Sequence, residues 1–145
     1  MPDQKPESVR MVVPMLVCRD PAAEIEFLQA AFAAVELSRR QSESGAIVHA
    51  TLAIGPSLVM LHDESPHLAS RAPQPDGSSS VVVYLYIDAV DQVVARAVQS
   101  GARILLPAEN AFWGDRVARI LDPAGHVWNV ATRPAATWYR DRMFW

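Results

Sequence analysis

The same pattern of apolar and polar residues occurs twice along this chain, once in each half. In the first half, an apolar run is followed by Asp20, a residue type that caps helices through its side chain. Ile25, Leu28 and Phe32 then recur at the spacing of one helical face, which predicts a helix with an apolar stripe. Extended patterns surround this helix, and we expect strands at 10–18, 35–39, 46–54 and 57–62.

The second half repeats this order. A strand is expected at 81–87 and a helix at about 88–100, and Gly101 then ends that helix. One face of this helix is expected to carry Val90, Val93, Val94, Ala97 and Val98. Further strands are expected at 103–106, 116–121 and 126–132. Gly55 and Gly125 mark equivalent hairpins about half a chain apart, so a duplicated βαβββ unit is the simplest explanation.

The pattern therefore predicts the α+β class, with two βαβββ modules in a single domain at 10–132. Module 1 covers about 10–62, a crossover loop rich in Pro, Ser and Gly covers 63–80, and module 2 covers about 81–132. Residues 133–145 form an aromatic C-terminal tail. We expect its large apolar side chains to be buried, either against the chain's own sheet or against a second subunit.

Composition narrows the classes of function. The chain has 145 residues, of which 50% are hydrophobic and 20% charged, as in an ordinary globular domain. Its net charge of −3 and its lack of a Lys/Arg cluster argue against nucleic acid as a partner. The polar N-terminus has no signal core and no stretch is long enough to span a membrane, so we expect no membrane partner. The single cysteine, Cys18, excludes an internal disulfide and fits a cytoplasmic protein.

Two motifs carry a family resemblance. Residues 112–116 read Phe-Trp-Gly-Asp-Arg, and residues 122–128 read Asp-Pro-Ala-Gly-His-Val-Trp around a tight turn. In this order they resemble the C-terminal hairpin of the glyoxalase/bleomycin resistance/dioxygenase superfamily (vicinal oxygen chelate fold), and most of all its PhnB-like branch. The resemblance implies curled mixed sheets around a concave cavity, and a homodimer. It also implies a divalent metal, in most members, on the first and last strands of each module.

The positions that correspond to the family's metal ligands do not carry metal-binding side chains. Carried over by spacing, they are Val13, Met60, Val82 and Asn129. Divalent metals of this family need imidazole or carboxylate donors, and aliphatic carbon offers no lone pair. We therefore expect no metal and no other cofactor.

The same alternation predicts what the concave face offers instead. Seven residues are the predicted ligand contacts: Met15, Met60, His62, Tyr84, Tyr86, Trp113 and Asn129. A mostly apolar lining with a few polar groups suits a flat or aromatic ligand. The alternative is that these side chains fill a closed core. Asp115 and Arg116 are adjacent on an extended segment, so we expect them to point to opposite faces.

Three functions remain open. The leading hypothesis is a metal-free protein that binds a small molecule and sequesters an aromatic antibiotic or related metabolite, as bleomycin-resistance proteins do. The second is a lyase, isomerase or dioxygenase-like enzyme of the same fold, with a relocated metal or with acid–base groups among His62, Glu64, Tyr84 and Asp115. The third is an accessory domain that functions through its dimer surface.

Overall fold

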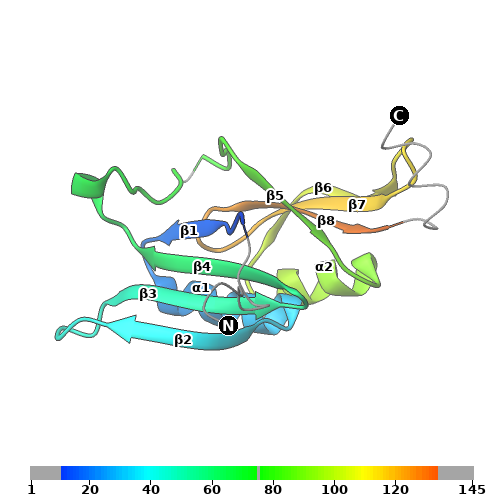
Figure 1. Ribbon diagram of the computed structural model, residues 1–145. Coiled ribbons are helices and arrows are strands. Elements are labelled where there is room, and N and C mark those ends of the chain that lie inside the picture. Colours follow the sequence, from blue (N-terminus) through cyan, green and yellow to red (C-terminus); the bar gives the residue numbers. More distant parts are fainter. Residues whose placement is uncertain (1–10, 75, 134–145) are drawn as a thin grey trace.

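Each half of the chain forms its own four-stranded sheet with one long helix. The computed structural model describes residues 11–74 and 76–133. The first module contains β1 (Met15–Cys18), α1 (Pro21–Phe32), β2 (Val35–Gln41), β3 (Ile47–Ile54) and β4 (Ser57–Asp63). The second contains β5 (Val82–Tyr86), α2 (Val90–Gln99), β6 (Arg103–Asn110), β7 (Arg116–Leu121) and β8 (Val127–Thr132). Figure 1 shows the two sheets, with a short 3₁₀ helix, η1 (Pro66–Leu68), in the crossover between them.

The two sheets have the same topology. Their strand orders are β1-β4-β3-β2 and β5-β8-β7-β6, with the first strand parallel to the last strand and the other pairs antiparallel. This confirms the predicted α+β class and the two βαβββ modules. The predicted aromatic tail lies outside the described residues. No helix in the described part of the chain has the length and apolarity that a membrane span requires.

Two strand boundaries and the burial of one helix residue differ from the expected ones. The first strand begins at Met15 rather than near residue 10, because Pro14 has no N–H for a ladder, and Met11 and Val12 before it are exposed. β6 runs on to Asn110, past Pro107, because its register shifts between Leu106 and Glu109. On α2, Val98 is exposed at the edge of the stripe that Val90, Val93, Val94 and Ala97 bury.

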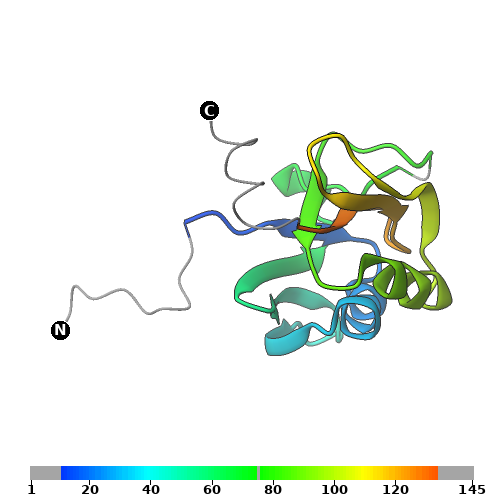
Figure 2. The ribbon, with the colours of Figure 1, turned by 90° about the vertical axis from the view of Figure 1, so that its right-hand side faces the viewer.

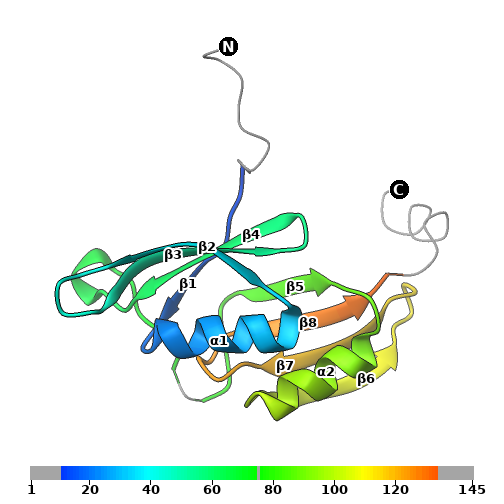
Figure 3. The same ribbon diagram turned by 90° about the horizontal axis from the view of Figure 1, so that it is seen from below.

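Both helices pack against their own sheets and against each other, so the two modules share one core (Figures 2 and 3). The Phe32 ring of α1 contacts the Trp128 ring of β8, with centroids 4.9 Å apart. Arg96 of α2 donates a hydrogen bond to the carbonyl oxygen of Ala31 at 3.3 Å. The modules are therefore joined through their helices and through β8.

Asp122 organises this junction. Its Oδ1 accepts hydrogen bonds from the backbone N–H groups of Ala124 and His126, both at 2.9 Å, which fixes the turn between β7 and β8. Its Oδ2 accepts the indole N–H of Trp128 at 2.8 Å. Across the module boundary, His126 donates from Nε2 to the carbonyl oxygen of Val17 at 2.9 Å. The Asp-Pro-Ala-Gly-His-Val-Trp motif thus links the two modules.

Glu24 of α1 is buried beside Asp122, and only 1% of its surface is exposed. Neither of its carboxyl oxygens accepts a hydrogen bond from the described residues. Burial, and then the nearby carboxylate of Asp122, raise the pKa of Glu24 well above the usual range. The protonated, neutral form of Glu24 is therefore favoured in the folded protein.

Replacing Glu24 tests whether its side chain is protonated in the folded protein. A raised folded-state pKa stabilises the fold below the unfolded pKa, and this stability is lost as the pH rises through the folded pKa. Glu24→Gln has no proton to lose, so its free energy of unfolding should rise relative to wild type as the pH increases above about 5. Urea denaturation at several pH values measures this difference. Glu26→Gln, an exposed change on the same helix, is the control, and a parallel pH profile for Glu24→Gln and wild type would contradict the assignment.

Ala33 ends α1 in the left-handed conformation, with φ 57° and ψ 34°. An L-residue in this region pays a steric cost that glycine avoids. We predict that Ala33→Gly stabilises the fold by about 0.5–1 kcal/mol, measured by urea denaturation. Ala30→Gly, at an exposed position inside the same helix, should instead destabilise it by about 0.5–1 kcal/mol. Equal losses for both variants would show that Ala33 is not strained.

Candidate functional site

On the second sheet, three aromatic side chains converge on one carboxylate. Tyr84 and Tyr86 alternate with residues of β5 that face α2, so their rings lie on the opposite, open face of the sheet. Both phenol groups donate hydrogen bonds to Oδ2 of Asp115, at 2.8 and 2.9 Å. The indole N–H of Trp113 donates to the same oxygen at 3.0 Å. We call Tyr84, Tyr86, Trp113 and Asp115 the tyrosine–aspartate cluster.

The carboxylate at the centre of this cluster is fully buried. Asp115 is 0% exposed, and its Oδ1 has no hydrogen-bond partner among the described residues. A buried acceptor without a partner costs about 1–3 kcal/mol, so the cluster is maintained at some expense of stability. Burial and the hydrogen bond to Asp115 raise the pKa of Tyr84, which keeps its phenol protonated as a donor.

The rest of the Phe-Trp-Gly-Asp-Arg motif positions Asp115. Gly114 adopts a φ of 107° in the turn before β7, where the Asp115 carbonyl oxygen accepts the N–H of Ala111 at 2.7 Å. Arg116 points the other way and binds both carboxylate oxygens of Asp91 on α2, at 2.9 and 3.0 Å. The prediction that Asp115 and Arg116 face opposite sides is confirmed.

Asn129 continues the same open face. It lies between Tyr84 of β5 and Arg119 of β7, which are its partners in the two ladders. Its side-chain oxygen accepts a hydrogen bond from Nε of Arg119 at 2.7 Å. The open face of the second sheet therefore carries aromatic rings, an amide and a guanidinium group in neighbouring positions.

The family's metal position does not fit a divalent cation in this chain. Of its four residues, Val13, Met60, Val82 and Asn129, only Asn129 offers an oxygen, and that oxygen already faces the positive charge of Arg119. Within residues 11–74 and 76–133, no three His, Cys, Asp or Glu side chains come together as metal ligands would. The side chains at this position are therefore unsuited to hold the divalent metal of a metal-dependent reaction.

The other predicted contacts lie on the first sheet. Met15 pairs with Met60, and Val17 pairs with His62, so Met15, Met60 and His62 share the face opposite α1. Nδ1 of His62 donates to the carbonyl oxygen of Asp63 at 2.6 Å, while Met15 is 45% exposed. The alternation of side chains was correctly predicted. The seven predicted contacts, however, form two groups on two separate sheets.

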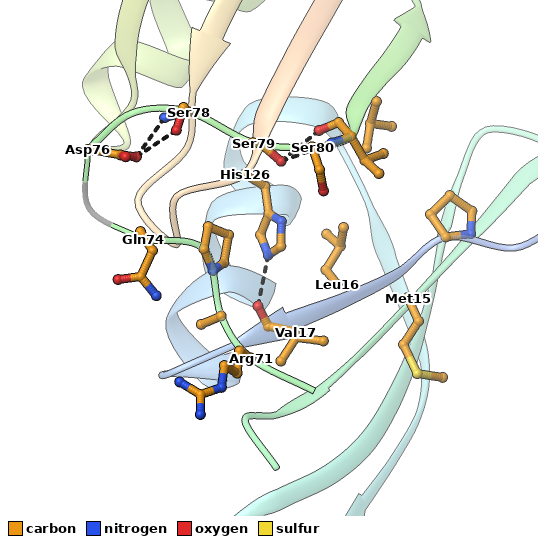
Figure 4. A pocket seen from close by; sticks show the side chains of 15 residues that line it. Met15, Leu16, Val17, Arg71, Gln74, Asp76, Ser78, Ser79, Ser80 and His126 are labelled. Atoms are coloured by element: carbon orange, nitrogen blue, oxygen red, sulfur yellow. Dashed lines mark hydrogen bonds between the residues drawn. The ribbon is translucent and has the colours of Figure 1, made fainter. Parts of the chain in front are cut away.

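A pocket of about 680 Å³ lies between β1 and the crossover loop (Figure 4). Its apolar part is formed by Met15, Leu16, Val17, Val81 and Val83, and its polar part by Arg71, Gln74, Asp76, Ser78, Ser79, Ser80 and His126. Met15 is the one predicted contact that lines it. Sequence reasoning missed this pocket because hydrophobic periodicity does not reveal the path of an irregular loop, and the Ser-rich stretch 78–80 was the only local signal.

Two groups with possible acid–base or nucleophilic chemistry have structural partners instead. Oε2 of Glu64 accepts the backbone N–H of Ala72 at 2.8 Å and so fixes the start of the crossover loop. Cys18 is fully buried, and burial, followed by the carboxyl groups around it, raises the pKa of its thiol far above the usual range. His62 and Asp115, the remaining acid–base candidates beside Tyr84, lie in different modules.

Comparison with known proteins identifies the family. The family model described as the Glyoxalase/Bleomycin resistance protein/Dioxygenase superfamily matches residues 10–130. Uncharacterized proteins of Mycobacterium bovis and Mycobacterium tuberculosis are each 38% identical over 120 residues, which cover 81% of this chain and 79% and 71% of theirs.

Solved structures agree with this fold. TioX from Micromonospora sp. ML1 is 26% identical, with a TM-score of 0.66 over 86% of this chain and 99% of that chain. The fosfomycin resistance protein FosX from Listeria monocytogenes, complexed with Mn(II) and sulfate, is 15% identical with a TM-score of 0.67, over 92% of this chain and 96% of that chain, and shares the fold alone. The PhnB-like branch stays a prediction. The chain belongs to the glyoxalase/bleomycin resistance protein/dioxygenase superfamily.

Proposed function

We propose that this protein binds a small aromatic molecule on the open face of its second module, without a metal. The tyrosine–aspartate cluster is the main observation that supports this proposal. Because Asp115 holds Tyr84, Tyr86 and Trp113 through hydrogen bonds, their rings are fixed before a ligand arrives. Rigid rings lose little conformational entropy on binding, and this favours affinity.

The geometry of the two tyrosine rings supports an aromatic ligand. Their centroids are 5.1 Å apart and the planes are tilted by 37°. Tyr84 is 40% exposed, so a flat ligand can reach its ring. Stacking on such a surface contributes about 0.5–1.5 kcal/mol per ring pair beyond the apolar area buried.

We propose a homodimer as the functional form. Large apolar side chains are exposed on the open faces of both sheets, among them Met15, Val35, Tyr84 and Leu106. An apolar surface of this kind is unusual for a monomer and marks an interaction site. A second copy would cover it and place the Met15, Met60 and His62 group of one subunit opposite the tyrosine–aspartate cluster of the other.

The proposed ligand class is an aromatic antibiotic or a related metabolite. Two observations support sequestration over catalysis: the metal position lacks suitable donors, and the candidate acid–base groups are divided between the modules or have structural partners. The family includes bleomycin resistance proteins, and a FosX structure shares the fold. The cytoplasmic location, and the absence of nucleic acid and membrane partners, stay predictions from the sequence.

Ligand-induced stabilisation tests this function. We predict that bleomycin or quinoline raises the unfolding temperature of metal-free protein, and that pyruvate does not. A ligand that binds only the folded state at about 100 times its Kd adds about 2.7 kcal/mol. Tyr84→Ala should lower the affinity by about tenfold or more, whereas Leu68→Ala, at an exposed position in the crossover, should leave it unchanged.

Stabilisation by pyruvate alone, or turnover of methylglyoxal–glutathione adduct by the metal-free protein, would contradict the binding function. Light scattering on the same samples tests the dimer. A mass of about one chain at concentrations of tens of micromolar would contradict it.

A further inference from the structure

We propose that the tyrosine–aspartate cluster selects organic cations, so that the aromatic ligand carries an amine, guanidinium or quaternary ammonium group. This inference rests on the proposed function and specifies the charge of its ligand. The directions of the hydrogen bonds determine what the cluster offers to a ligand. Both phenol protons point at Asp115, so the outward sides of Tyr84 and Tyr86 offer only lone pairs and π faces.

The carboxylate behind these rings has no direct ion-pair partner among the described residues. Asp115 forms no salt bridge among residues 11–74 and 76–133. Arg116 pairs with Asp91 on the opposite face, and the guanidinium of Arg119, on the same face, donates to Asn129 rather than to Asp115. The buried carboxylate therefore creates a negative potential at the surface of the aromatic cluster, and in a low dielectric that potential is strong.

The chain already places one cation against this surface. The guanidinium carbon of Arg133 lies 4.4 Å from the centroid of the Tyr86 ring, within the range of a cation–π contact. A pocket of about 440 Å³ surrounds this contact, lined by Tyr86, Ile87, Asp88 and Arg133. Asp88 adds a second carboxylate to its wall. Arg133 thus shows which type of group the Tyr86 face accepts.

Together these features describe a cage for a positively charged group. Aromatic faces attract cations through the negative centre of the ring, and a carboxylate behind the rings increases the attraction. An anionic aromatic ligand would meet the charge of Asp115 with no donor left on the phenols. The cluster therefore distinguishes ligands by charge as well as by shape.

Three probes that share one phenyl ring and differ in charge test the preference: benzyltrimethylammonium, benzyl alcohol and benzoate. We expect NMR titration of the full-length protein to show benzyltrimethylammonium binding about tenfold more tightly than benzyl alcohol, with benzoate weakest. The shifts should be largest at the indole N–H signal of Trp113, which donates to the cluster carboxylate.

Matched variants test which side chains cause the preference for the cationic probe. Asp115→Asn keeps the size of the side chain but removes its charge, and should reduce the preference for the cation to about twofold or less. Asp91→Asn removes the same charge from the helix-facing side of the module and should leave the preference intact. Arg133→Gln removes the internal cation and should tighten binding of benzyltrimethylammonium several-fold, but not that of benzyl alcohol.

The outcomes separate this inference from the proposed function. If all three probes bind equally, or if folded Asp115→Asn keeps the cation preference, the charge selection is wrong while aromatic binding stands. If no aromatic probe binds, the proposed function fails as well. Should Asp115→Asn not fold, Arg133→Gln decides, because an unchanged affinity for benzyltrimethylammonium would overturn the role of the Tyr86 face.

Discussion

The structure depends on one buried carboxylate, Asp122, and on the donors that gather around it. It fixes the β7–β8 turn through two backbone N–H groups and holds Trp128 through the indole N–H. Trp128 in turn packs on Phe32 of the other module. Because β5 pairs with β8, the position of this hairpin also sets where Tyr84 and Tyr86 lie relative to Asp115. A structural motif at one end of the hairpin thus supports the candidate site at the other.

The two modules keep the same topology but carry different chemistry on their open faces. In the first, Met15, Met60 and His62 form a soft apolar surface with one imidazole. In the second, aromatic rings surround a buried carboxylate. Duplication explains the shared frame, whereas the outward-facing residues differ between the modules. At the family's metal position this chain has side chains that bind divalent metals poorly, and Arg119 lies beside Asn129.

Much of the fold could be predicted because it follows from local signals. Asp20 caps α1 as expected, accepting the N–H of Ala23, and the alternation of side chains on β5 and β8 is as predicted. Sheet order was not predictable, since pairing of β1 with β4 involves residues far apart in the chain. The burial of Glu24 was not predictable either. A glutamate in a helix normally faces solvent, and the sequence pattern does not show that Glu24 lies beside Asp122.

The sequence named three members of the tyrosine–aspartate cluster but not their arrangement, and their contact with a ligand stays a prediction. Tyr84, Tyr86 and Trp113 were all expected to contact ligand, yet Asp115, their common acceptor, was considered only as an acid–base group. The hydrogen bonds from Tyr84 and Tyr86 span 31 and 29 residues, and periodicity carries no information on such contacts. The predicted ligand contacts also lie on two sheets rather than one. This could not be predicted, because the alternation of side chains defines a face within one sheet and not how two sheets are arranged.

A crystal structure of the protein with benzyltrimethylammonium tests the central claim most directly, namely that the tyrosine–aspartate cluster is a ligand site for a cationic aromatic molecule. We expect the ammonium group over the Tyr84 and Tyr86 rings, with the Arg133 guanidinium displaced from its place over Tyr86. Ligand density confined to the pocket between β1 and the crossover loop, with Arg133 still stacked on Tyr86, would contradict it.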